Sequence, residues 1–156
     1  MSIEWHNLAE DFTRDGALRD IYILQTTQAD WQQALDTVRS TATAIDYRSG
    51  DQPSPLPSTF GSSTSEFGRL LSFRIGAIGL TCHFFHEAEI EFSFWPHELT
   101  NQTDLDARIR FIQRLGDSVG KPVIVCPENY PDAAFLRYEP ESHSTSFIPY
   151  AAPGNA

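Results

Sequence analysis

Glu87-Ala88-Glu89-Ile90-Glu91-Phe92-Ser93-Phe94 is the stretch that decides the fold class, because its side chains alternate between polar and apolar without a break. A period of two is typical of a β-strand that packs one face on a core. The apolar set, Ala88, Ile90, Phe92 and Phe94, is predicted to face the core. The polar set, Glu87, Glu89, Glu91 and Ser93, is predicted to meet water or a partner. The stretch therefore predicts a sheet with one covered and one open face.

Apolar runs on both sides of this stretch predict the remaining strands. They lie at residues 20–24, 71–78, 80–85, 123–126 and 135–138. Gly79 is predicted to form a bend or bulge between two of these runs. The strands outnumber the helices and cluster together along the chain, which favours a sheet with few crossover helices.

Two helices are predicted from apolar residues spaced at i, i+3, i+4 and i+7. The first covers residues 28–42 after an N-cap at Thr26 or Thr27, and its apolar positions are Trp31, Ala34, Leu35 and Val38. The second starts after an N-cap at Thr100 or Thr103 and ends at Gly120, with the apolar stripe Leu105, Ile109, Ile112, Leu115 and Val119. The predicted fold class is α+β, with a mixed or antiparallel sheet covered on one face by two helices.

The length and composition predict one domain over residues 1–150 and a disordered tail at residues 151–156. Residues 49–66, rich in Pro, Gly and Ser, are predicted to form a long loop. The first residues lack the basic and apolar regions of a signal peptide, and no apolar run approaches the roughly 18 residues that span a membrane. Cys82 and Cys126 are expected to be buried free thiols, so the expected localisation is cytoplasmic.

The formal net charge of -10 argues against nucleic acid and against anionic membrane surfaces as partners. Lys121 is the single lysine, and the arginines are spread along the chain. The closest basic group is Arg108, Arg110 and Arg114, of which Arg110 and Arg114 share a helix face. We interpret this group as a solvated helix face.

Histidines and cysteines suggest catalytic or metal-binding chemistry, but their spacing does not fit either. His83 and His86 on one strand would point to opposite faces, and no paired-cysteine motif accompanies them. Cys126 ends an apolar strand in an acidic chain, whereas a reactive cysteine needs an exposed, electropositive setting. The sequence therefore predicts no metal, no cofactor and no catalytic residue.

The strongest functional feature is a predicted acidic patch. No Lys or Arg occurs between Arg74 and Arg108, whereas this interval holds six carboxylates: Glu87, Glu89, Glu91, Glu98, Asp104 and Asp106. Such a field attracts a basic partner and accelerates encounter, and aromatic anchors are available at Trp95 and Phe85. The predicted partner-binding residues are Glu87, Glu89, Glu91, Trp95 and Glu98. A simple solvated face and a catalytic carboxylate pair are the alternatives.

The stretch Phe111-Ile112-Gln113-Arg114-Leu115-Gly116-Asp117-Ser118-Val119-Gly120-Lys121-Pro122-Val123-Ile124-Val125-Cys126-Pro127-Glu128-Asn129 runs from a helix end into a strand. It resembles a segment of small bacterial immunity proteins of polymorphic-toxin systems, which are contact-dependent or type VI secretion systems. Phe135-Leu136-Arg137-Tyr138-Glu139-Pro140 resembles the closing segment of the same group.

The resemblance implies a non-enzymatic antidote in the cytosol that binds a cognate toxin, often by masking the toxin's active site. Many such toxins attack nucleic acid or nucleotide precursors and have basic clefts, which an acidic inhibitor suits. We therefore expect an immunity protein that binds a basic toxin, with the residue 50–66 loop as a further possible contact. The alternatives are a small cytosolic hydrolase or transferase, and a secretion-chaperone or adaptor subunit.

Overall fold

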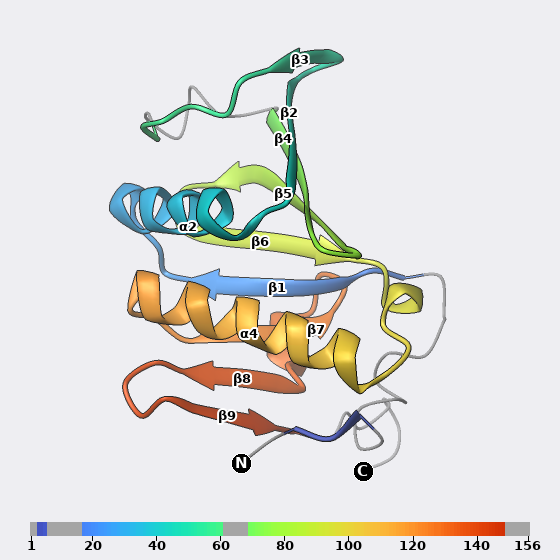
Figure 1. Cartoon of the computed structure of the whole chain (residues 1–156). Coiled ribbons are helices and arrows are strands. Elements are labelled where there is room, and N and C mark those ends of the chain that lie inside the picture. Colours follow the sequence, from blue (N-terminus) through green and yellow to red (C-terminus); the bar gives the residue numbers. More distant parts are fainter. Residues whose placement is uncertain (1–2, 6–16, 61–68, 149–156) are drawn as a thin grey trace.

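In the part of the chain that the structure describes, a nine-stranded antiparallel sheet carries two α-helices on one face (Figure 1). The computed structural model describes residues 3–5, 17–60 and 69–148. Within these ranges the strand order is β3-β2-β4-β5-β6-β1-β7-β8-β9, and every neighbouring pair is antiparallel. The predicted α+β class is confirmed, and the sheet is antiparallel. The predicted tail at residues 151–156 lies outside the described residues.

The strands outnumber the helices in the described ranges, as the sequence predicted. The strands are β1 (Arg19–Leu24), β2 (Ala44–Ser49), β3 (Gln52–Ser54), β4 (Arg69–Ile75), β5 (Ile78–His86), β6 (Glu89–Phe94), β7 (Val123–Pro127), β8 (Leu136–Glu139) and β9 (Ser144–Phe147). The helices are α2 (Gln28–Thr41) and α4 (Gln102–Val119), with short 3-10 turns η1 (Pro96–Glu98) and η2 (Pro131–Ala133).

Helix α2 begins as predicted, whereas α4 begins at a different cap. Thr27 and Asp30 form a reciprocal capping box, in which each side chain accepts the other residue's backbone N–H. The N-cap of α4 is Asn101, whose Oδ1 accepts the backbone N–H of Asp104 at 2.9 Å. Thr100 was wrongly predicted as a cap because its hydroxyl instead donates to the Asp104 carboxylate. Thr103, the other predicted cap, lies inside the helix.

The β4–β5 hairpin corrects the predicted strand boundary. The turn consists of Gly76 and Ala77, between the paired residues Ile75 and Ile78, rather than a bend at Gly79. Gly76 has a φ of 61°, which glycine adopts without strain at the first central position of a two-residue hairpin turn. The apolar run continues through this turn, so hydrophobicity alone did not locate it.

Three outer strands were missed. The sequence predicted a loop at residues 49–66, but residues 52–54 form β3 and pair with β2. In β2 the apolar and polar residues alternate only over residues 45–48, and β9 has a single apolar residue, Phe147, so both patterns are too short to indicate a strand. Residues 61–66 of the predicted loop lie outside the described ranges.

The core fills the space between the sheet and the two helices. It is one connected cluster of buried side chains that reaches from Ile21 in β1 to Tyr138 in β8. Phe73, Phe92 and Phe111 meet at its centre with ring centroids 5.6–5.8 Å apart. Burial of each such side chain contributes about 1.5–3 kcal/mol. Because α2 and α4 cover the same side, no α-helix of the described residues lies on the other face of the central strands.

Candidate functional site

A row of small polar side chains crosses the helix-free face of the sheet. In β4, β5 and β6 the residues that alternate with the buried core residues face away from the helices. The strand register aligns five such positions on neighbouring strands. We call them the polar row: Asp46, Ser72, Thr81, Ser93 and Asp20.

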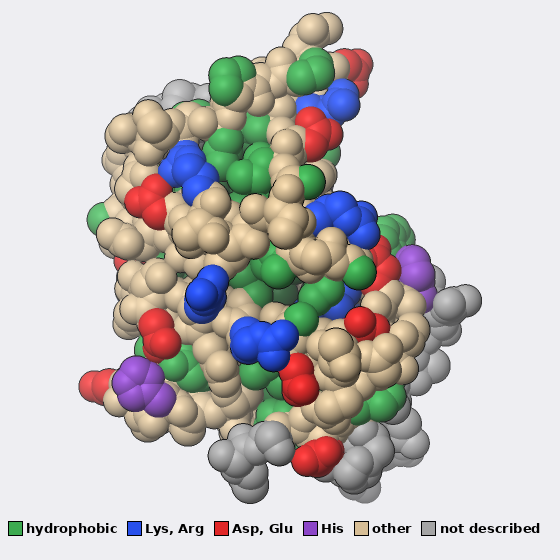
Figure 2. Space-filling view, in the orientation of Figure 1, with side chains coloured by type: hydrophobic (Ala, Val, Ile, Leu, Met, Phe, Trp, Pro, Cys, Tyr) green, Lys and Arg blue, Asp and Glu red, His purple; other side chains and the backbone are tan. Residues whose placement is uncertain are grey.

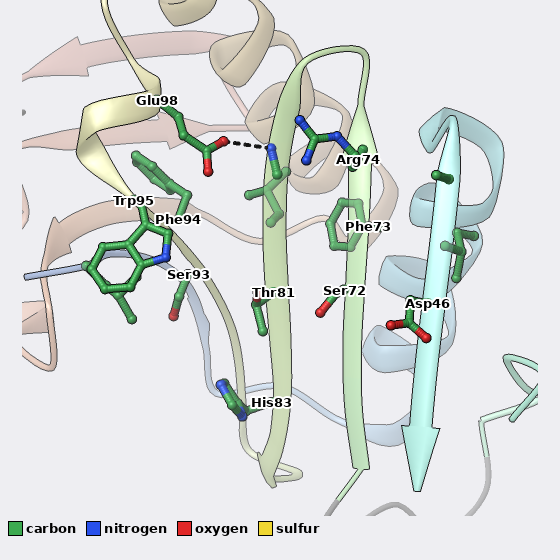
Figure 3. A pocket seen from close by; sticks show the side chains of 15 residues that line it. Asp46, Ser72, Phe73, Arg74, Thr81, His83, Ser93, Phe94, Trp95 and Glu98 are labelled. Atoms are coloured by element: carbon green, nitrogen blue, oxygen red, sulfur yellow. Dashed lines mark hydrogen bonds between the residues drawn. The ribbon is translucent and has the colours of Figure 1, made fainter. Parts of the chain in front are cut away.

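A groove of about 540 Å³ lies over the polar row (Figure 3). Ser72, Thr81 and Ser93 lie along its floor. Trp95 and Asp46 stand on opposite sides of this floor, and the other labelled rim side chains are Arg74, Glu98 and His83. The groove exists because the floor side chains are short while those of the rim are long.

Three charged side chains of the rim, those of Glu98, Arg74 and Asp46, are each oriented by a hydrogen bond to one of their terminal atoms. The Gly79 N–H donates to Glu98 Oε2 at 3.1 Å, and Arg74 Nη2 donates to the carbonyl of Ala77 at 2.9 Å. Asp46 Oδ2 accepts Arg48 Nε at 3.0 Å. These side chains are therefore oriented, and the second carboxylate oxygens of Glu98 and Asp46 accept no hydrogen bond from a described residue.

A buried carboxylate ends the polar row at β1. Asp20 is fully buried, and its two oxygens accept Ser93 Oγ and the Asn129 backbone N–H, each at 2.8 Å. The Tyr22 hydroxyl lies between the carboxyl groups of Asp20 and Glu91. It is 3.3 Å from Asp20 Oδ2 and 3.2 Å from Glu91 Oε1. Burial, together with the nearby charge of Asp20, raises the pKa of Glu91 to about 7. Glu91 thus titrates near neutrality.

The five predicted partner-binding residues fall into two groups at opposite ends of β6. Glu87 is exposed in the β5–β6 turn, and Glu89 and Glu91 follow on the helix-free face. Trp95 and Glu98 follow the other end of β6 and line the groove. A strand of this length spans about 17–20 Å, so the five residues do not form one patch. The alternation predicted for residues 87–94 begins at Glu89, because Glu87 belongs to the turn.

The first group lies beside two exposed apolar side chains. Phe85 is 52% exposed and Leu24 is 42% exposed. Leu24 is the cross-strand partner of Glu89, and a register shift between His83 and His86 places Phe85 in an irregular part of β5. We call Leu24, Phe85, Glu87 and Glu89 the acidic corner. No Lys or Arg within the described ranges forms an ion pair with its two glutamates. The sequence pointed to Phe85 but missed Leu24.

The candidate nucleophile and zinc ligands are dispersed. Cys126 is fully buried, and burial raises the pKa of its thiol to about 12, which disfavours the reactive thiolate. Cys82 is buried in the core, whereas His83 stacks on Phe85 with ring centroids 4.9 Å apart. His97 lies against Trp95 beyond the other end of β6. Among the described residues no three His, Cys, Asp or Glu side chains gather as a metal site.

The arginines of α4 divide into a buried and an exposed set. Arg110 and Arg114 are exposed and border a cleft of about 260 Å³, as the predicted solvated face requires. Arg108 was wrongly included, because it is 2% exposed and its guanidinium lies 4.8 Å from the ring centroid of Phe94. Figure 2 shows Lys and Arg side chains spread over the helix-bearing side and interspersed with Asp and Glu.

Comparison with models of protein families, with curated protein sequences and with solved structures returns no match. Neither α2 nor α4, the two long helices of the described ranges, is apolar enough to cross a membrane.

Proposed function

We propose that this protein binds a basic partner protein through the acidic corner and neutralises it, as an immunity protein neutralises a cognate toxin. The main support for the proposal is the placement of two exposed apolar side chains beside two carboxylates that form no ion pair with a described Lys or Arg. Phe85 and Leu24 are the apolar members, and Glu87 and Glu89 are the carboxylates. The formal net charge of -10 supports the same choice of a basic partner.

The two kinds of side chain have separate roles in this proposal. An aromatic ring that becomes buried at an interface contributes affinity, and Phe85 offers about half of its surface for this. Glu87 and Glu89 accelerate the encounter with a cationic surface and select against acidic partners. Glu91 contributes less negative charge near neutral pH, because its pKa is raised to about 7. Of the three predicted glutamates, Glu87 and Glu89 therefore remain as the charged residues of the proposed interface.

The toxin class rests on the resemblance of residues 111–129 and 135–140 to immunity proteins. A toxin that acts on nucleic acid or nucleotides needs a basic cleft for its substrate. An acidic inhibitor with a central aromatic side chain would occupy such a cleft and exclude the substrate. We therefore propose that the partner is the toxin encoded beside this gene and that binding masks its active site.

The test is to measure binding between this chain and the neighbouring gene product, and to ask whether the chain protects cells that express that product. Glu87→Lys/Glu89→Lys should abolish protection. The matched control is Asp51→Lys/Glu141→Lys, because it changes the charge equally at exposed turns away from the corner. Absence of binding and of protection by the unmodified chain would reject the toxin assignment. Equal loss in both double variants would reject the corner as the interface.

The two alternatives make different predictions. A hydrolase or transferase that uses Cys126 gains no support from a fully buried thiol with a raised pKa. A secretion-chaperone or adaptor subunit would assemble with itself, so light scattering of the purified chain distinguishes it. A homo-oligomer that covers Phe85 would favour the adaptor, whereas the toxin-binding proposal expects the corner to be free before the partner is added.

A further inference from the structure

We propose that the groove over the polar row binds a neutral saccharide. This site lies at the other end of β6 from the acidic corner, and the inference does not depend on the proposed function. Its floor, its charged rim and its aromatic side each restrict the kind of ligand that fits.

The floor offers hydroxyl groups that the fold leaves unused. The side-chain hydroxyls of Ser72 and Thr81 make no hydrogen bond with any described residue, although each lies on a central strand. Ser93 donates its hydroxyl proton to Asp20, which leaves its oxygen as an acceptor. Neighbouring strands are about 4.8 Å apart, so the three hydroxyls form a line across the sheet. A ligand with several hydroxyl groups in a row matches this line.

The rim combines hydrogen-bond donors with acceptors. Glu98 and Asp46 each have one oxygen held by the protein and a second that accepts no hydrogen bond from a described residue. Arg74 is held through Nη2, and its Nη1 lies near Glu98 above Gly79. Arg48 lies outside the groove lining but forms an ion pair with Asp46 at the rim. A rim that presents both donors and acceptors suits sugar hydroxyls, which both donate and accept.

Trp95 supplies the apolar surface that a sugar ring requires. Its side chain is 45% exposed, and its indole stands beside the hydroxyl floor (Figure 3). One face of a pyranose ring carries mainly C–H groups, and these pack against an aromatic ring while the hydroxyls reach outward. The groove volume of about 540 Å³ lies within the range of about 300–1,000 Å³ typical of small-ligand sites.

A substitution at Gly79 can test the groove, because an added side chain there would enter the groove without disturbing the core. A Cβ at this position would lie 3.5–3.7 Å from the side-chain ends of Glu98 and Arg74, which is ordinary contact distance. Gly79→Ala should therefore leave the fold intact and occupy the space between the two charged groups. Trp95→Ala removes an exposed side chain and should also leave the fold intact. Tyr130→Ala is the matched control, since it deletes an exposed aromatic ring that does not line the groove.

The experiment titrates the full chain with glucose, galactose, N-acetylglucosamine and short oligomers of each, up to about 10 mM, by NMR chemical shift and tryptophan fluorescence. At least one sugar should bind, and Trp95→Ala and Gly79→Ala should each weaken it about tenfold. Tyr130→Ala should leave the affinity unchanged. Free glycine and glutamate are included as charged ligands. If no sugar binds, if only charged ligands bind, or if the groove variants keep full affinity, the saccharide proposal is overturned.

Discussion

Replacing Arg108 by methionine is expected to raise the stability of the fold. The Arg108 side chain is 2% exposed, and none of its three guanidinium nitrogens hydrogen-bonds to a described residue. Burial lowers the pKa of Arg108 from 12.5 to about 10, against the opposing attraction of Glu98 and Asp104. A buried cation without hydrogen-bond partners costs free energy that a methionine of similar length does not.

The magnitude follows from the pKa and from the ring contact. A change from 12.5 to about 10 corresponds to about 3 kcal/mol of destabilisation at neutral pH. The guanidinium also lies 4.8 Å from the centroid of the Phe94 ring, and this contact returns about 1–2 kcal/mol. A methionine at this position would fill similar space, but it would have neither the cost of the buried charge nor the favourable contact of the guanidinium with the Phe94 ring. The expected net gain for Arg108→Met is about 1–2 kcal/mol.

Urea unfolding at pH 7 measures this gain directly, with Arg110→Met as the control on the same helix. Arg110 is exposed, so its replacement should change the free energy of unfolding by less than about 0.5 kcal/mol. The folded-state pKa is depressed, so the cost of Arg108 is present below about pH 10 and declines as the pH rises further. A loss of more than about 1 kcal/mol in Arg108→Met, with the control unchanged, would show that the guanidinium has a stabilising partner and would refute the reasoning.

Three further substitutions test the buried carboxyl pair, the helix packing and the helix cap. Glu91→Gln should stabilise the fold by about 1–2 kcal/mol at pH 8 and have little effect at pH 4. The raised pKa of Glu91 means that stability is lost as the pH rises from 4.5 through about 7; an equal effect at both pH values would contradict this. Gly116→Ala should destabilise by about 1–2 kcal/mol although alanine favours helices, because the new Cβ would lie 2.5 Å from the buried Tyr138 ring; a stabilised variant in thermal unfolding would show that the ring can move aside. Thr27→Ala should lower stability by about 1 kcal/mol in urea unfolding through loss of the capping box, and no change would mean that the cap is dispensable.

The sequence predicted the parts of the fold that local patterns determine. The alternation in residues 89–94 located β6 and its buried face, and the Thr27 cap and Gly120 end gave the helix limits closely. In β2 such an alternation covers only residues 45–48, and β9 has a single apolar residue, so neither strand gave a clear signal. The Gly76 turn was missed because apolar residues continue on both sides of it.

The candidate sites were predictable only in part, because they depend on contacts between strands. Glu87, Glu89 and Phe85 are close in the sequence and were identified as a group. Leu24 joins them only through the pairing of β1 with β6. Likewise Ser72 and Thr81 are ordinary strand residues until the register aligns them with Ser93. The burial of Arg108 depends on the position of Phe94 below α4, which no spacing along the chain reveals.

The salt dependence of the association rate with the neighbouring gene product tests the role of the acidic corner most directly. The rate should fall steeply as salt rises, and the rate for Glu87→Lys/Glu89→Lys should be at least about tenfold lower at low salt. Asp51→Lys/Glu141→Lys should retain most of the unmodified rate. Equal rates for the unmodified chain and the corner variant at every salt concentration would contradict the account.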